Sequence, residues 1–273
     1  MRNKKIYLDH NATTPVDPRV LEAMLPYFGE QFGNASSITH AYGWDAEEAV
    51  DIAREQVAGL IGARPAEICF TSGATEAINL ALLGAAEAAR AKGNHLVTCR
   101  TEHKAVLGAC RELQNRGFAV TYLPVNGQGA IDPDQLRAAI TDQTTLVCLM
   151  HANNETGVIH PLKKISEITR EKGVLLMTDA TQSVGKIPFD VEGLGVDLAA
   201  FSAHKLYGPK GVGGLYVRKK PKVELLPLLF GGGQEKGLRP GTLNVPGIAG
   251  LGKACEIAAV EMSEEALRLA QWR

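Results

Sequence analysis

Short apolar runs recur through the middle of this chain, and the intervals between them carry a helical period. Seven runs have the length and apolar content of buried strands. They cover residues 68–71, 95–99, 119–123, 146–150, 174–178, 198–202 and 214–217. Helical spacing fills intervals such as 104–116, 133–140 and 162–172. This alternation predicts an α/β fold with a mostly parallel, seven-stranded sheet and helices on both faces.

The last part of the chain predicts a long helix. Residues 247–254 nearly fit the phosphate loop of nucleotide hydrolases, but Ala254 stands where a Ser or Thr would hold magnesium, and no clear strand precedes them. We expect instead the start of a helix that packs through small residues. From Ala254 onward, apolar residues at helical spacing predict an amphipathic helix that reaches the final residue without a closing Gly, Asn or Pro.

Composition narrows the class of protein. The 273 residues are 45% hydrophobic and 22% charged, with a net charge of −1, as in soluble globular proteins. No Lys/Arg-rich run favours nucleic-acid binding, and no apolar stretch approaches the ~20 residues of a membrane span. The basic residues at 1–5 lack the apolar region of a secretory signal. We therefore expect a cytoplasmic protein with no nucleic-acid or membrane partner.

The five cysteines are scattered and lie mostly in apolar patterns, which is typical of reduced, buried thiols. Cys99 with His103, and Cys148 with His151, have spacings that invite a zinc site. Neither pair has a second close pair to complete four ligands, so we predict no metal site.

Candidate chemistry begins at Lys205, which follows an apolar strand and is flanked by hydroxyl and imidazole groups in segment 201–211. A desolvated lysine beside a phosphate-holding group is what a Schiff-base cofactor requires. Asp179 ends another apolar run, where its carboxylate can lie beneath a pyridine nitrogen and keep it protonated. Taken singly, Lys205 also fits a surface loop, and Asp179 also fits a helix N-cap.

A third feature suits a phosphate. After the strand 68–71, the backbone N–H groups of Gly73, Ala74 and Thr75 open an alanine-rich helix predicted to run to about residue 90, and helix N-termini bind anions. Ser202 and His204, together with Thr75, complete the predicted phosphate shell. Ser72 or Thr75 also fits a plain helix cap.

Seven segments in order along nearly the whole chain resemble the cysteine desulfurases. These are fold-type I pyridoxal-phosphate enzymes of the class V aminotransferase group, and the match is to their iron–sulfur-assembly branch. The segments are YLDHNATTP (7–15), SGATE (72–76), TEHKAV (101–106), NNETG (153–157), DATQ (179–182), the lysine segment 201–211, and GGGQE with LRPGT (231–235 and 238–242).

The resemblance implies pyridoxal 5'-phosphate as cofactor and a role for each matching residue. Lys205, His103 and Asp179 would be catalytic, with His103 stacked on the cofactor ring, although His103 also fits a helix cap. Asn154 and Gln182 would lie near the phenolic oxygen of the cofactor. Thr242 would reach the phosphate in the neighbouring subunit, which implies a homodimer. The cofactor-binding set is Gly73, Ala74, Thr75, His103, Asn154, Asp179, Gln182, Ser202, His204, Lys205 and Thr242.

The implied activity converts L-cysteine to L-alanine and passes the sulfur to a protein persulfide, and then to an iron–sulfur scaffold or another acceptor. None of the five cysteines matches the family nucleophile. We therefore expect an N-terminal segment (1–15), a large cofactor domain (16–250) and the start of a helix (251–273) toward a C-terminal small domain that is largely missing. A selenocysteine lyase, a small-amino-acid aminotransferase and a non-catalytic sulfur-transfer partner remain as alternatives.

Overall fold

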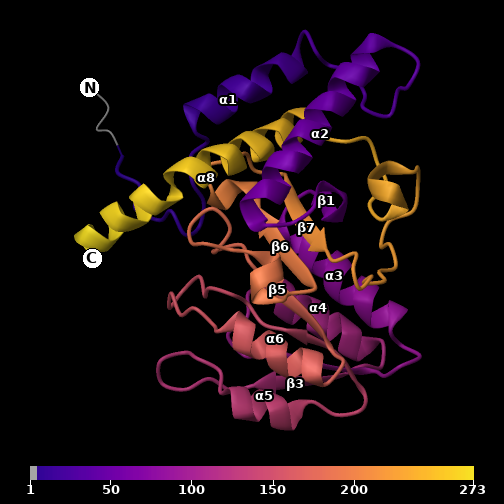
Figure 1. Ribbon diagram of the computed structural model, residues 1–273, viewed down its shortest axis with the longest axis vertical. Helices are drawn as coiled ribbons and strands as arrows, with labels where there is room; N and C mark the ends of the chain where they lie inside the picture. The colour runs from indigo at the N-terminus through magenta and orange to yellow at the C-terminus, as the bar shows by residue number, and fades with distance from the viewer. Residues whose placement is uncertain (1–4) are drawn as a thin grey trace.

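The computed structural model describes residues 5–273, and its centre is one seven-stranded sheet (Figure 1). The strands are β1 (Ile68–Thr71), β2 (His95–Cys99), β3 (Ala119–Leu123), β4 (Thr144–Cys148), β5 (Leu175–Asp179), β6 (Leu198–Ser202) and β7 (Gly213–Val217). Their spatial order is β1-β7-β6-β5-β4-β2-β3. Only β7 runs antiparallel to its neighbours. The predicted mostly parallel, seven-stranded sheet is therefore confirmed.

Four of the seven strands begin and end where the pattern predicts. The strand expected at 146–150 lies two residues earlier, that expected at 174–178 one residue later, and β7 begins one residue earlier. The apolar runs continue past the paired residues, because Leu149 and Met150 are buried beyond the end of β4. The buried apolar run therefore extends beyond the last residue that pairs with a neighbouring strand.

Successive residues of the parallel strands point into two separate cores. Val97, Val147 and Leu176 belong to one core, whereas their neighbours Leu96 and Leu146 belong to the other. This alternation places helices on both faces of the sheet. One face carries α3 (Ala74–Ala88) and α4 (Lys104–Asn115). The other carries α2 (Ala41–Ile61), α5 (Pro133–Ala139), α6 (Leu162–Glu171), α7 (Val191–Leu194) and the first part of α8 (Val245–Trp272).

The apolar pattern did not predict α1 (Pro18–Met24) or the 21-residue α2. Half of the buried residues of α2 are alanines, including Ala46, Ala49 and Ala53, so this face gives a weak apolar signal. This face packs against α8, and α1 also packs against α8 (Figure 1).

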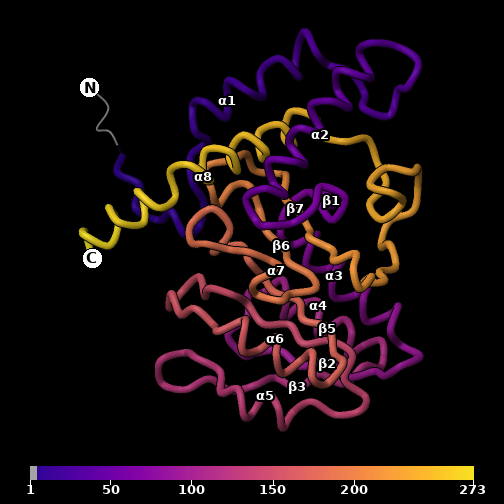
Figure 2. Tube along the Cα trace, viewed as in Figure 1, coloured from indigo at the N-terminus to yellow at the C-terminus, as the bar shows by residue number. Residues whose placement is uncertain are grey.

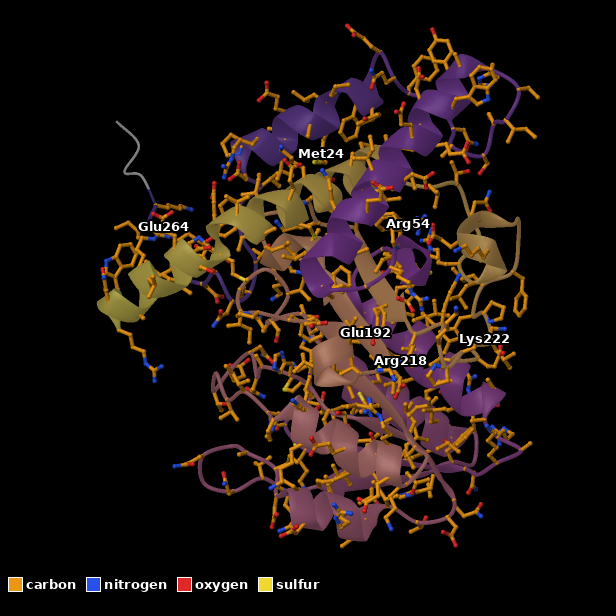
Figure 3. All side chains as sticks on the ribbon, in the orientation of Figure 1. Met24, Arg54, Glu192, Arg218, Lys222 and Glu264 are labelled. Atoms are coloured by element: carbon orange, nitrogen blue, oxygen red, sulfur yellow. The ribbon has the colours of Figure 1, made fainter. Side chains whose placement is uncertain are left out.

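The glycines of α8 explain this close packing. A Cβ on Gly252 would lie 2.5 Å from the Cα of Ala53 in α2, and one on Gly250 would lie 2.7 Å from the Sδ of Met24. Met24 is the last residue of α1, and its side chain lies against α8 (Figure 3). The expectation of a helix packed through small residues at 247–254 is therefore confirmed, and this helix begins already at Val245.

No helix within residues 5–273 has the length and apolar character needed to span a membrane. Residues 1–4, which include the basic Arg2 and Lys4 on which the expectation about a signal segment partly rests, lie outside the described residues.

Candidate functional site

The carboxyl ends of the parallel strands open into a cavity of about 840 Å³. Ligands bind at this edge in open α/β sheets. Ten of the eleven predicted cofactor residues line the cavity: Gly73, Ala74, Thr75, His103, Asn154, Asp179, Gln182, Ser202, His204 and Lys205. They end or follow five different strands, so the fold brings together residues that lie up to 132 positions apart (Gly73 to Lys205). The eleventh residue, Thr242, lies outside the cavity lining.

Lys205 lies in a 3-10 turn directly after β6. Its Nζ donates to the carbonyl oxygen of Ala12 (2.8 Å) and to that of Asn11. Burial lowers the pKa of Lys205, while the carboxylates of Asp179 and Asp9 act in the opposite direction. A lowered pKa increases the fraction of neutral, nucleophilic amine. The surface-loop interpretation of this lysine is therefore incomplete, because its amine is hydrogen-bonded inside the cavity.

Asp179 is the last residue of β5 and is almost fully buried. Its Oδ1 accepts a hydrogen bond from the backbone N–H of Thr181 (3.0 Å), in a turn rather than at a helix start. Burial raises the pKa of Asp179, and hydrogen bonds from Thr181 with the charges of His103 and Lys205 oppose that rise. The charge of Lys205 therefore favours a carboxylate at this position, against the effect of burial.

His103 combines the two roles that the sequence left open. It is the N-cap of α4, and its Nδ1 accepts a hydrogen bond from the backbone N–H of Ala105 (3.1 Å). The imidazole is exposed to the cavity at the same time. The capping bond therefore fixes the ring and leaves Nε2 available to exchange a proton.

The predicted anion site forms at the N-terminus of α3. Gly73 has φ 145° and ψ 178°, which a residue with a Cβ rarely adopts, and it places the first N–H groups of α3 at the cavity. Ser202 lies close by, since a Cβ on Gly73 would be 3.6 Å from its Oγ. His204 Nδ1 is 3.0 Å from Thr13 Oγ1, and burial lowers the pKa of His204. Burial thus favours a neutral imidazole at this site.

Gln182 and Asn154 bring two side-chain amides to the same cavity. Gln182 Nε2 donates to the carbonyl oxygen of Asn11 (3.0 Å), and its Oε1 accepts from Lys186 Nζ (2.6 Å). Asn154 Nδ2 donates to Glu155 Oε1 (2.9 Å). Burial lowers the pKa of Lys186 to about 8, and the charge of Lys205 acts in the same direction.

Several groups at the site received no role from the sequence analysis. The carbonyls of Asn11 and Ala12 hold Lys205, and Glu76 and Lys210 line the cavity. Asn11, Ala12 and Glu76 stand inside the segments YLDHNATTP and SGATE, and Lys210 lies in the lysine segment, so the segments themselves marked these positions. The partners of these groups depend on contacts between distant residues, which no local pattern specifies.

The thiols lie apart from the site residues. All five cysteines are free and buried, and none lines the cavity among the described residues. Burial raises the pKa of each thiol, to about 12 for Cys110 and Cys255. Thiols of this kind carry little thiolate near pH 7. Within residues 5–273, no three potential metal-ligating side chains come together, the cysteine and histidine pairs included.

Comparison with known proteins identifies the relatives of this chain. The family model described as "Aminotransferase class-V" matches residues 6–271. "Cysteine desulfurase IscS" of Anaeromyxobacter sp. (strain Fw109-5) is 62% identical over 264 residues, which cover 97% of this chain and 65% of that protein. The protein of the same name from Rickettsia rickettsii (strain Iowa) is 57% identical over 260 residues, 95% of this chain and 63% of that protein. The chain thus spans about two thirds of the length of these relatives.

Solved structures share the fold closely. A "NifS-like protein" superimposes with a TM-score of 0.92 at 47% identity and covers 96% of this chain and 71% of that one. A structure titled "SspA in complex with cysteine" superimposes with a TM-score of 0.89 at 41% identity, covering 98% and 78% of the two chains. The residues of the cavity therefore belong to a fold that is shared well beyond local motifs.

Proposed function

Because this chain belongs to the class V aminotransferase family, we propose that it carries the pyridoxal-phosphate centre of a cysteine desulfurase. The substrate would be L-cysteine and the products L-alanine and a protein persulfide. The observation that carries this proposal is one cavity in which a lysine of lowered pKa, a buried carboxylate and a helix N-terminus meet.

The cavity fits pyridoxal phosphate in the chemistry of its donors. Lys205 is an amine that can bond the aldehyde carbon, and Asp179 is a buried carboxylate for the pyridine nitrogen. The N-terminus of α3 with Ser202 would hold the phosphate, together with Thr242 of a second copy of the chain. When bound, the cofactor supplies an electron sink at its protonated ring.

The residues of the chain divide the remaining tasks. Hydrogen bonds from Thr181 and the nearby amine of Lys205 favour the carboxylate form of Asp179 against the burial that raises its pKa, and a carboxylate here would favour a proton on the group beside it. Lys205 and His103 both face the cavity and can hold or move the α-proton of the substrate. The carbonyls of Asn11 and Ala12 orient the amine of Lys205.

Sulfur transfer requires a thiolate that attacks the substrate sulfur, so that an S–S bond forms as the C–S bond breaks and the carbon takes up a proton. The five buried thiols with raised pKa are unsuited to this step. We therefore assign the sulfur acceptor to a thiol other than these five. An iron–sulfur scaffold protein would then accept the sulfur from the persulfide. The chain itself would act as a cytoplasmic homodimer.

The test is the visible absorption spectrum of the purified chain with pyridoxal phosphate, beside Lys205→Ala, before and after L-cysteine is added. We expect a band that depends on Lys205 and shifts with L-cysteine. The absence of a Lys205-dependent band would overturn the assignment of the cofactor site. A Lys205-dependent band whose position does not change when L-cysteine is added would overturn the assignment of the substrate.

A further inference from the structure

The charges around the cavity pose a problem for an anionic ligand. Four carboxylates line it, from Asp9, Glu76, Glu155 and Asp179, whereas the described lining contains only two lysines, Lys205 and Lys210. A phosphate monoester carries up to two negative charges near neutral pH. Glu76 is the acid placed most directly against such a group, because it lies in the first turn of α3, where the phosphate would bind.

Glu76 is held at this position by its own structural contact. Its Oε2 accepts a hydrogen bond from the backbone N–H of Ser72 (2.7 Å), which stabilises the turn between β1 and α3. An acid in the first turn of a helix also interacts favourably with the helix dipole. The same carboxylate would compete with phosphate for that dipole and repel it.

Arg239 meets this carboxylate from a distant part of the chain. Its Nε donates to Glu76 Oε1 (2.7 Å) and its Nη2 to Glu76 Oε2 (3.3 Å). Both side chains are largely buried, at 23% and 21% exposure. Burial would raise the pKa of Glu76, but the hydrogen bonds from Arg239 and Ser72 leave that pKa below its ordinary value. The pair is therefore a fixed anion and a fixed cation of zero net charge.

The segment that carries Arg239 is anchored independently. Glu235 accepts hydrogen bonds from Arg54 (2.7 and 3.0 Å) and from the backbone N–H of Phe70 in β1 (2.9 Å). Its side chain is only 2% exposed. Glu235 and Lys236 have φ of 46° and 59°, so these contacts hold two non-glycine residues in left-handed backbone. Arg239 thus reaches Glu76 from a segment with a fixed path.

We propose that Arg239 is the residue that neutralises Glu76 and thereby allows the N-terminus of α3 to accept the phosphate group of the cofactor. This inference rests on the proposed function for the identity of the ligand. Arg239 acts here through Glu76, as a positioning and charge-balancing residue outside the cavity lining.

The test uses thermal shift to measure how tightly the apo chain binds three ligands. These are pyridoxal phosphate, inorganic phosphate, and pyridoxal, which lacks the phosphate. Arg239→Gln leaves Glu76 uncompensated, and we expect pyridoxal phosphate and inorganic phosphate to bind roughly three- to tenfold more weakly. Pyridoxal should bind as before. Raising the salt concentration should shrink the difference, because the effect is a partly exposed charge interaction.

The double variant Arg239→Gln with Glu76→Gln separates charge from structure. A glutamine amide at this position can still accept the hydrogen bond from Ser72 but carries no charge, so phosphate affinity should return to within about twofold of the unmodified chain. Arg90→Gln is the matched control, since Arg90 pairs with Glu87 at the far end of α3 (2.8 Å) and should leave all three affinities unchanged.

The outcomes separate this inference from the proposed function. An unaltered phosphate affinity in Arg239→Gln, or a loss that Glu76→Gln fails to restore, would overturn the role of Arg239. Equal weakening for pyridoxal would also overturn it, since that points to a disordered site. A missing Lys205-dependent band would instead refute the cofactor assignment, and inorganic phosphate would still test the charge balance at α3.

Discussion

At the scale of single residues, the unexpected group is Glu102, which immediately precedes the site residue His103. It is 5% exposed, its Oε1 accepts a hydrogen bond from the backbone N–H of Met150 (2.7 Å), and its Oε2 has no partner among the described residues. Burial raises the pKa of Glu102 well above its ordinary value, and the Asp179 carboxylate adds to that rise. We therefore predict that Glu102, whose hydrogen bond with Met150 joins the loops after β2 and β4, is protonated in the folded chain.

Glu102→Gln tests this protonation state. A carboxyl whose pKa is raised on folding binds more protons in the folded state, so its contribution to stability is present at low pH and is lost as the pH rises above its unfolded pKa of about 4.3 toward the folded value. Relative to Glu102→Gln, the unmodified chain should lose up to about 1.4 kcal/mol of unfolding free energy per pH unit in that window.

Urea unfolding of the apo chain at several pH values gives the comparison. The partly exposed Glu112, which pairs with Arg116 (2.9 Å), serves as control, because hydrogen bonds from Arg116 and Asn115 lower its pKa. Relative to Glu112→Gln, the unmodified chain should show no such fall with rising pH. A difference between the unmodified chain and Glu102→Gln that stays constant with pH would show that Glu102 is already charged in the folded state.

At the scale of elements, two helical glycines have opposite surroundings. Gly252 of α8 faces the Cα of Ala53 in α2 at the point where the helices pack together, whereas no atom lies within 4 Å of a Cβ built on Gly59 of α2. We expect Gly59→Ala to stabilise the chain by about 0.5–1 kcal/mol through helix propensity. Gly252→Ala should destabilise it by about 1–3 kcal/mol, because two backbones must move apart.

The unfolding free energy of both variants in urea decides this prediction, and each serves as the control for the other. Stabilisation by both substitutions would mean that α2 and α8 can separate at no cost. The close contact would then be dispensable.

At the scale of the whole molecule, apolar side chains remain exposed in several regions, and two of these lie in the C-terminal part of the chain. Leu226, Leu229 and Phe230 are 51%, 50% and 89% exposed, although Leu225 and Leu228 of the same stretch pack on the core. The part of α8 beyond Cys255 exposes further apolar side chains, namely Val260, Leu267, Leu269 and Trp272. In Figure 2 the last turns of α8 project beyond the body of the molecule. Exposed apolar area of this kind favours association.

Phe230→Asp should weaken self-association of the chain by at least about tenfold, because a charge replaces an aromatic side chain that would lose its contact with water in a dimer. Sedimentation equilibrium measures this. Lys222→Asp, on an exposed lysine of the same segment that pairs with Glu224, is the control for an added acidic residue. Equal dissociation constants for Phe230→Asp and the unmodified chain would exclude Phe230 from the contact between copies.

The sequence by itself determined which segments form the strands, the strand ends at which the site residues lie, and ten residues of the cavity. The strands and the first candidates follow from local information: an apolar run of strand length is buried, and a polar residue directly after it lies at the carboxyl edge of the sheet. Lys205 and Asp179 were placed in this way. His103, Asn154 and Gln182 were found only through the resemblance of their segments to a known family.

Only the tertiary structure decided the features that depend on partners far apart in the chain. The burial of Glu102, the pairing of Arg239 with Glu76 over 163 positions and the contact of Gly252 with α2 join segments that no local pattern relates. The alanine-rich α2 likewise acquires its role only when α8 covers it. The physical reason is that charge balance and close packing depend on distances across the folded chain. Apolar periodicity, in contrast, depends only on the order of neighbouring residues in the sequence.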